Sequence, residues 1–278
     1  MSDITMIKIS IITPSFNQSA YLEQTILSVI EQEYPYIEYI ILDAGSTDGS
    51  VDIIRKYSDR IAFWESRPDN GQADAIYRGF ERATGDIIAW INSDDYYLEG
   101  AFSAVIEYFQ KNPEATWLIG NGILVDRDGN ELLKLYSPHI TFDKLLFYGG
   151  AFNQPSLFMK REAFFSCGGF DRTLKFSFDL DLSLNLAKLK SPGQIDTFLS
   201  AFRYHPASKT STIDLVRLRD DTFIRKVKYH DMTKNRLLYE VKKSANILAL
   251  ALHRLRTSGV GNYLRYVLSQ KTYRNRYV

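Results

Sequence analysis

Two adjacent carboxylates end the segment Asn92-Ser93-Asp94-Asp95, which overlaps the end of a mainly apolar run at residues 86–92. Divalent cations such as Mg²⁺ and Mn²⁺ prefer oxygen ligands and take several of them from substrate phosphates. One carboxylate could hold such a cation while its neighbour binds a ribose hydroxyl or a second coordination position. The alternative is a turn in which Asp94 and Asp95 cap the following helix, since aspartate is a frequent turn residue.

Two further polar side chains lie at the ends of apolar runs. Asp43 ends the run 37–43 and opens a segment rich in Ser, Gly and Asp. Its carboxylate could accept hydrogen bonds from a nucleobase N–H or a ribose hydroxyl, or it could belong only to a turn. His205 follows the run 194–203 and is a candidate ligand of a metal or a diphosphate. The alternative is a loop histidine that binds no ligand.

A third pair of carboxylates, Asp179 and Asp181, lies beside Phe176 and Phe178. Aromatic neighbours exclude water, and a carboxylate that loses water acquires a raised pKa and becomes a usable general base. The alternative is that Asp179 caps a helix while Asp181 is solvated.

The elements that must position these side chains alternate along the first half of the chain. Apolar runs predict strands, and apolar residues at helical spacing predict the helices between them. This alternation predicts an α/β fold whose parallel strands are joined by right-handed crossovers and covered on both faces. Ligands bind beyond the carboxyl ends of such strands, where the polar segments lie. The predicted strands are 7–13, 37–43, 61–66 and 86–92, and the predicted helices are 21–32, 51–57, 72–83 (ended by Gly85) and 101–112.

The second half has a mixed pattern. Residues 116–126 and 131–136 flank an Asp-Gly turn and predict a hairpin. Strands are also expected at 155–160 and 194–203, and a helix at 179–189. We therefore expect one domain over residues 1–213, with a first half at about 1–115 and a second half at 116–213.

Residues 214–278 form a basic, mostly helical region. They contain 15 Lys and Arg against 5 Asp and Glu, whereas the remaining residues contain 19 against 28. Leucines recur at helical spacing with cations mostly off the stripe, so this region could lie on an anionic membrane. The alternative is that the stripe packs against the domain.

The composition narrows the class of protein. The net charge of +1 argues for no particular partner, and we expect no nucleic acid. The single cysteine, Cys167, excludes an intrachain disulfide and a cysteine-based zinc site and fits a reducing compartment. The N-terminus lacks a signal-peptide pattern, and the apolar stretch 247–252 is too short to span a bilayer. We expect a cytoplasmic protein that is peripheral, if at all, at the inner face of the cytoplasmic membrane.

Six segments in order resemble the inverting family 2 glycosyltransferases of the GT-A fold, of the bacterial surface-polysaccharide type. The resemblance spans about residues 7–210. The segments are Thr13-Pro14-Ser15-Phe16-Asn17, Asp43-Ala44-Gly45-Ser46-Thr47-Asp48-Gly49-Ser50, Asp69-Asn70-Gly71-Gln72-Ala73-Asp74-Ala75, Asn92-Ser93-Asp94-Asp95, Gly168-Gly169-Phe170-Asp171 and Phe178-Asp179-Leu180-Asp181-Leu182.

The resemblance implies a GT-A, Rossmann-like sheet, mostly parallel and flanked by helices, with a helical C-terminal extension. It also implies that the half at about 1–115 binds the nucleotide sugar and that the half at 116–213 binds the acceptor. It implies a role for each matching residue. Asp179 takes the place of the catalytic base. Contacts to the nucleotide sugar are implied for Thr13, Pro14, Asp43, Arg67, Gly71, Asp74, Asn92 and Asp94, and metal contacts for Asp94, Asp95 and His205.

Two residues depart from the family pattern. Asn92 stands where the acidic motif usually begins with Asp, although an amide still accepts a hydrogen bond from ribose. Phe178 stands where Glu often precedes the base, which leaves the choice between Asp179 and Asp181 open.

The resemblance also implies the reaction and its partners. A sugar would move from a nucleoside diphosphate sugar, most often a UDP-sugar, to a hydroxyl of a glycan or lipid-linked glycan, with inversion. The cofactor would be Mg²⁺ or Mn²⁺. The alternatives are a non-catalytic nucleotide-sugar-binding module and a sugar-phosphate nucleotidyltransferase, although the latter should have a Gly-rich basic loop after its first strand. A dinucleotide-dependent oxidoreductase is disfavoured because no G-x-G-x-x-G follows the first strand.

Overall fold

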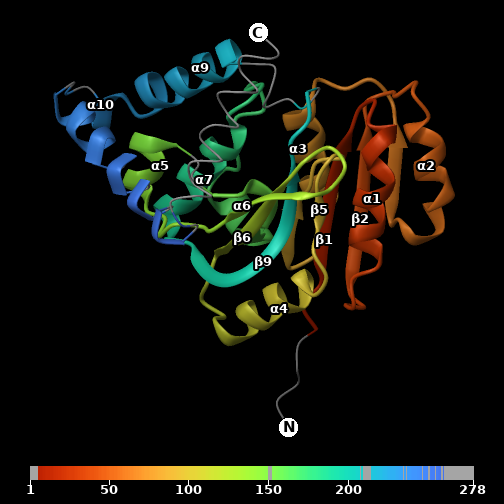
Figure 1. Cartoon of the computed structure of the whole chain (residues 1–278). Coiled ribbons are helices and arrows are strands. Elements are labelled where there is room, and N and C mark those ends of the chain that lie inside the picture. The colour runs from red at the N-terminus through yellow and green to blue at the C-terminus, as the bar shows by residue number, and fades with distance from the viewer. Residues whose placement is uncertain are drawn as a thin grey trace.

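The computed structural model describes residues 6–149, 152–206, 208, 214–233, 235, 237–245, 247–249, 251–253, 255–257 and 259. Within these residues one sheet of nine strands runs through the molecule in the order β3-β2-β1-β4-β8-β6-β9-β5, and β7 pairs with β6 (Figure 1). The strands are β1 Ile9–Ser15, β2 Ile37–Asp43, β3 Phe63–Ser66, β4 Ile87–Trp90, β5 Tyr96–Tyr97, β6 Trp117–Val125, β7 Glu131–Leu135, β8 Leu157–Lys160 and β9 Gly193–Arg203.

The helices lie mostly between consecutive strands. They are α1 Ser19–Ile30, α2 Ser50–Lys56, α3 Gln72–Arg82, α4 Ala101–Lys111, α5 Phe142–Tyr148, α6 Arg161–Ser166, α7 Phe178–Leu189, α9 Asp214–Phe223 and α10 His230–Thr233. There are also short 3-10 turns, η1 Ser58–Arg60 and η2 Gln154–Ser156, and a π-helical turn, η3 Ile224–Lys228. Residues 237–245, 247–249, 251–253 and 255–257 are helical as well, and together with α9 and α10 they are called the C-terminal helices.

The first half confirms the predicted α/β alternation. β1 pairs in parallel with β2 and β4, and β2 pairs in parallel with β3. The second half is mixed, as expected: β8 runs antiparallel to β4 and β6, and β6 with β7 forms the predicted hairpin. The sequence did not predict β5, α5 or α6, which are too short to show a periodic pattern.

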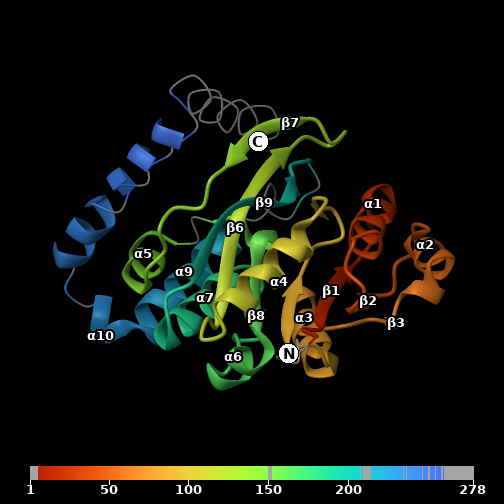
Figure 2. The same cartoon turned by 90° about the horizontal axis from the view of Figure 1, so that it is seen from below.

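Alternating side chains of the strands contribute to two cores, one on each face of the sheet. Helices lie on both faces of the sheet (Figure 2). Ile9 and Ile11 of β1 pack with α1, α2 and α4, whereas Ile12 packs with α3, α6 and α7 on the other face. Coverage of both faces leaves the carboxyl ends of the strands as the place where polar groups reach solvent.

Glu38 joins three segments near the start of the parallel strands. Its carboxylate accepts hydrogen bonds from Ser10 Oγ at 2.5 Å, Lys8 Nζ at 2.9 Å and Thr84 N at 2.7 Å. Burial alone would raise the pKa of Glu38, but these bonds lower it from 4.5 to about 2. The charged carboxylate therefore stabilises the contacts between β1, β2 and the turn before β4.

Gly85 has a different role from the predicted helix signal. α3 ends at Arg82 and is capped by Ala83. A Cβ at Gly85 would lie 2.5 Å from Ser10 Oγ and 2.8 Å from its backbone nitrogen. Glycine is required here because the chain passes close to β1.

The C-terminal helices pack against the domain through part of their surface. Lys242 Nζ lies 3.0 Å from Asp143 Oδ2, and the Tyr239 and Phe147 ring centroids are 5.5 Å apart. Leu237, with 77% of its surface exposed, and Leu248, with 61%, face solvent. Leu237 and Leu248 of the predicted stripe therefore do not pack against the domain, whereas Tyr239 and Lys242 do. Contact of the stripe with a membrane stays a prediction. No helix among the described residues is both long and apolar enough to cross a membrane.

Candidate active site

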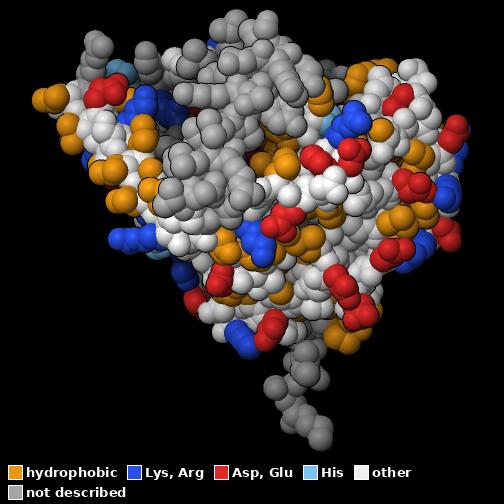
Figure 3. Space-filling view, in the orientation of Figure 1, with side chains coloured by type: hydrophobic (Ala, Val, Ile, Leu, Met, Phe, Trp, Pro, Cys, Tyr) orange, Lys and Arg blue, Asp and Glu red, His pale blue; other side chains and the backbone are white. Residues whose placement is uncertain are grey.

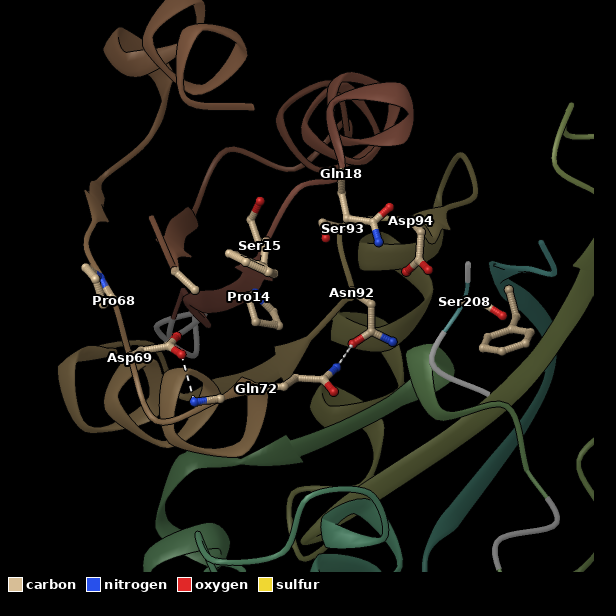
Figure 4. A pocket seen from close by; sticks show the side chains of 14 residues that line it. Pro14, Ser15, Gln18, Pro68, Asp69, Gln72, Asn92, Ser93, Asp94 and Ser208 are labelled. Carbon is tan, nitrogen blue, oxygen red and sulfur yellow. Dashed lines mark hydrogen bonds between the residues drawn. The ribbon is translucent and has the colours of Figure 1, made fainter. Parts of the chain in front are cut away.

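A pocket of about 580 Å³ opens at the carboxyl ends of β1, β2 and β4. In Figure 4, Pro68 and Asp69 line one side, Gln18, Ser93 and Asp94 the other, and Gln72 and Asn92 the base between them. The position is the one predicted from the polar segments that follow the strands. Its lining comprises Pro14, Ser15, Phe16, Gln18, Ala44, Pro68, Asp69, Gly71, Gln72, Asn92, Ser93, Asp94, Phe202 and Ser208.

Asn92 lines the pocket, and both its amide oxygen and its amide nitrogen form hydrogen bonds. Its Oδ1 accepts a hydrogen bond from Gln72 Nε2 at 2.6 Å (Figure 4). Its Nδ2 donates to Asp95 Oδ2 at 3.1 Å. Asn92 thus links the start of α3 to the end of β4.

Asp94 faces the pocket and contacts His205. Asp94 Oδ2 and His205 Nε2 are 3.0 Å apart, and the Asp94 side chain is 16% exposed. The His205 side chain is 3% exposed, and its ring lies 4.7 Å from the Tyr21 ring, centroid to centroid. The structure therefore joins two predicted site residues that are separated by 111 positions.

Asp95 lies in a different environment from its neighbour, although both belong to a turn in which Asp95 N donates to the Asn92 carbonyl at 3.1 Å. It is buried, and its Oδ1 accepts a hydrogen bond from the Arg203 backbone N–H at 2.8 Å. Burial, and then the charge of Asp94, raise the pKa of Asp95 well above its usual value. Asp95 thus connects the loop after β4 to β9 through this hydrogen bond, and it is not part of the pocket lining.

Arg203 belongs to this region and was not among the residues predicted from the sequence. Its Nε donates to the Asp94 backbone carbonyl at 2.9 Å and its Nη1 to the Arg127 carbonyl at 2.8 Å. Its Nη2 donates to Gln24 Oε1, and the guanidinium lies 4.8 Å from the Tyr21 ring centroid. A buried guanidinium with these partners holds the backbone of Asp94 in place. The sequence does indicate Arg203 as a possible site residue, because it ends a predicted strand two residues before His205.

The Asp43 carboxylate stabilises the loop after β2 through hydrogen bonds. Asp43 Oδ2 accepts hydrogen bonds from Ser46 N at 2.8 Å and Ser66 Oγ at 2.6 Å. Asp43 is buried and does not line the pocket, whereas the adjacent Ala44 does. Thr13 is also buried, and its hydroxyl lies 3.0 Å from Tyr39 Oη.

Of the remaining residues predicted to contact the nucleotide, two line the pocket and two lie outside its lining. Pro14 and Gly71 line the pocket, and Gly71 has φ of 106°, a backbone conformation that favours glycine. Arg67 is exposed and pairs with Glu65 at 3.1 Å. Asp74 pairs with Arg172, which joins α3 to the segment before α7.

Asp179 and Asp181 have different surroundings in the first turn of α7. Asp181 is fully buried, accepts a hydrogen bond from Asp171 N at 2.9 Å and pairs with Lys228. Asp179 is partly exposed, and its Oδ1 accepts from Leu180 N at 2.8 Å. Neither lines the pocket described above. α7 nevertheless begins close to β4, because the Phe178 and Trp90 ring centroids are 6.1 Å apart.

Few side chains at the pocket could act as metal ligands. In the part of the chain that the structure describes, no group of three or more His, Cys, Asp and Glu side chains is placed to hold an ion. Asp94 and His205 form the one predicted pair that meets at the pocket wall. The pocket also contains residues that were not predicted as ligand contacts: Gln18, Asp69, Gln72, Ser93, Phe202 and Ser208.

The sequence model of the family described as "Glycosyl transferase family 2" matches residues 10–168. An uncharacterized glycosyltransferase of Haemophilus influenzae is 34% identical over 159 residues, which are 56% of this chain and 63% of the relative. The putative teichuronic acid biosynthesis glycosyltransferase TuaG of Bacillus subtilis is 34% identical over 143 residues, 50% of this chain and 56% of TuaG. The matches thus span less than two thirds of either relative.

Two solved structures share the fold. S. aureus TarS 1–349 in complex with UDP-GlcNAc has a TM-score of 0.61 at 16% identity, over 97% of this chain and 92% of that one. The mannosyltransferase PcManGT from Pyrobaculum calidifontis, in complex with GDP-Man and Mn²⁺, has a TM-score of 0.60 at 15% identity, over 99% and 84%. At these identities the likeness concerns the fold, and the predicted GT-A-like architecture is confirmed.

Proposed function

Because the chain belongs to glycosyl transferase family 2, we propose that it moves a sugar from a nucleoside diphosphate sugar to an acceptor hydroxyl with inversion. The observation that carries the proposal is the pocket at the strand ends, with Asp94 and His205 in contact at its wall. The family match does not favour the nucleotidyltransferase or the non-catalytic binding module.

The donor would occupy the pocket between the loop after β3 and the end of β4. The pocket volume of about 580 Å³ is in the usual range for sites that hold a small ligand. Pro14, Ala44 and Pro68 provide apolar surface, and Gly71 lets the backbone approach a ligand closely. Asp43 would support the site by binding the backbone N–H groups of Gly45 and Ser46. Thr13, Arg67 and Asp74 would support it through side-chain contacts with Tyr39, Glu65 and Arg172, respectively. A UDP-sugar remains the expected donor.

We assign a divalent cation, Mg²⁺ or Mn²⁺, to Asp94 and His205. Asp94 Oδ2 and His205 Nε2 lie 3.0 Å apart, and a carboxylate oxygen and an imidazole nitrogen could both be ligands of such an ion. Such an ion takes its remaining ligands from water and substrate phosphate, so two protein ligands suffice. When bound, it supplies positive charge next to the diphosphate on which negative charge develops.

Asp179 would act as the general base. The acceptor oxygen bonds to the anomeric carbon, the bond from that carbon to the diphosphate breaks, and the hydroxyl proton passes to the Asp179 carboxylate. Asp181 is less suited to this role because it is buried and paired with Lys228. One displacement inverts the anomeric centre without a covalent intermediate.

Asp179→Asn should keep nucleotide affinity and lower transfer by about 10²–10⁴, the usual contribution of a general base. Transfer is followed by release of the nucleoside diphosphate, and product configuration by NMR. Near-normal transfer by this variant would rule out Asp179 as the base.

The acceptor is expected to be a glycan or lipid-linked glycan in the biosynthesis of a surface polysaccharide, and the C-terminal helices would contact the inner face of the cytoplasmic membrane. Figure 3 shows hydrophobic side chains along these helices. The exposed set includes Leu237, Val241, Leu248 and Leu252. The full chain should sediment with anionic vesicles, and Leu248→Asp should weaken this. Equal sedimentation of both proteins, or none, would exclude the contact.

A panel of nucleotide sugars tests the proposal as a whole. With Mn²⁺ or Mg²⁺, at least one should be hydrolysed slowly without acceptor and consumed faster with one. Asp52→Ala, a change at an exposed side chain of α2, serves as the control. A folded protein that consumes no nucleotide sugar with either cation would refute the proposed activity.

A further inference from the structure

Three side chains from the region after residue 213 hold the segment that carries Asp179. They are Asp220 and Asp221 of α9 and Lys228 of η3. All three lie outside the residues 10–168 that match the family model. We propose that this part of the chain is a positioning element for the catalytic segment, and that Asp220 is its principal positioning residue.

Asp220 binds the backbone directly before α7. Its Oδ2 accepts hydrogen bonds from Lys175 N and Phe176 N, both at 2.8 Å. Asp220 is 2% exposed, and its Oδ1 lies 3.7 Å from Arg219 Nε. A buried carboxylate that accepts two successive N–H groups fixes the direction in which the chain enters the helix.

The N-terminal end of α7 has a second contact with α9, the helix that carries Asp220. Ser177 is the N-cap residue of α7, but its side chain makes no capping bond within that helix. Its hydroxyl donates to Asp221 Oδ1 at 2.6 Å, and Asp221 also lies 3.2 Å from Arg225 Nη1. The residue that usually stabilises its own helix is therefore used to attach α7 to α9.

The third link lies on the other side of the proposed base. Lys228 pairs with Asp181, which is fully buried and also accepts from the Asp171 backbone N–H. Asp179 is two residues from Ser177 and two residues from Asp181, so anchors on both sides determine where its carboxylate points. This inference rests on the proposed role of Asp179 and adds a function for the C-terminal region.

The test compares Asp220→Ala and Asp220→Asn with the exposed control Asp52→Ala. Asp220→Ala removes both hydrogen bonds to Oδ2, whereas the Asn amide oxygen can still accept them without the charge. Misplacement of a reacting group by about 1 Å can cost about 100-fold in rate. We therefore expect kcat to fall by about that factor in Asp220→Ala, with unchanged affinity for the donor nucleotide and partial recovery in Asp220→Asn.

Thermal unfolding confirms in each case that the variant is folded at the assay temperature. Affinity and kcat that fall together, or a kcat close to that of the control, would overturn the inference.

Hydrogen exchange provides a readout that does not depend on activity. The amides of Lys175 and Phe176 should exchange faster in Asp220→Ala, while peptides from β1 and α1 should not change. If the wild-type protein transfers no sugar, the proposed function fails, but the exchange experiment still tests the anchor. Unchanged exchange at residues 175 and 176 would overturn the inference whatever the activity.

Discussion

Arg203→Met removes the buried guanidinium that joins four segments around the pocket. The aliphatic part of the side chain is largely kept, and the lost groups are the donors to the Asp94 and Arg127 carbonyls and to Gln24 Oε1. The backbone N–H that binds Asp95 is unchanged. The substitution therefore isolates the contribution of the guanidinium.

The magnitude follows from the acceptors left without a donor. Asp94 is partly exposed and Gln24 and Arg127 are exposed, so water can replace the lost donors, and each lost hydrogen bond costs about 0.5–1.5 kcal/mol. Three such bonds at about 1 kcal/mol each, plus the lost cation–π contacts with Tyr21 and Tyr96, give a loss of about 3–5 kcal/mol in the free energy of unfolding. At roughly 2 °C per kcal/mol for a protein of this size, the melting temperature should fall by about 6–10 °C.

The assays are thermal unfolding and titration with a nucleoside diphosphate in the presence of Mn²⁺. Because Arg203 holds the backbone of Asp94, we expect nucleotide affinity to fall at least about tenfold, or ~1.4 kcal/mol. Arg55→Met, at a 63% exposed side chain, is the control and should change stability by less than about 0.5 kcal/mol. A variant that melts within about 2 °C of the wild type and binds nucleotide equally well would refute the role of Arg203.

Three further predictions concern single positions. Glu38 has a lowered pKa in the folded protein, about 2 against 4.5, so its stabilisation is complete above pH 4.5 and is lost as the pH falls towards 2. Glu38→Gln should therefore lose at most about 3 kcal/mol at pH 6 and much less at pH 3, as measured by urea unfolding; an equal loss at both pH values would contradict this. Gly71→Ala forces an alanine to a φ of 106° and should lower stability by about 1–3 kcal/mol together with nucleotide affinity; an unchanged melting temperature would count against it. Asp95→Asn should keep metal-dependent nucleotide binding, whereas Asp94→Asn should lose it, and equal losses in calorimetric titrations would instead make both carboxylates metal ligands.

The strands and the location of the pocket could be predicted because they follow from local patterns. The four apolar runs of the first half became parallel strands, and the polar segments after them met at one edge. The hairpin around residues 127–130 was also predictable from its Asp-Gly turn. These features depend on periodicity and turn chemistry within a few residues of one another.

Side-chain direction at the site could not be predicted in the same way. Whether Asp94 or Asp95 faces the pocket depends on the turn in which Asp95 N donates to the Asn92 carbonyl, and the residue types alone do not determine which carboxylate that turn directs towards the pocket. The Asp220 contact with Lys175 and Phe176 joins residues about 45 positions apart. No periodic pattern specifies such a contact, because it forms only after α7 and α9 have packed.

Calorimetric titration of the full chain with UDP, with Mn²⁺ and with a chelator, shows whether nucleotide binding needs a cation at Asp94 and His205. We expect one saturable site that requires the cation and loses at least tenfold in affinity in Asp94→Asn and in His205→Ala, ~1.4 kcal/mol in each case. Nucleotide binding of equal strength with the chelator and in both variants would contradict the assignment of Asp94 and His205 to the metal and diphosphate.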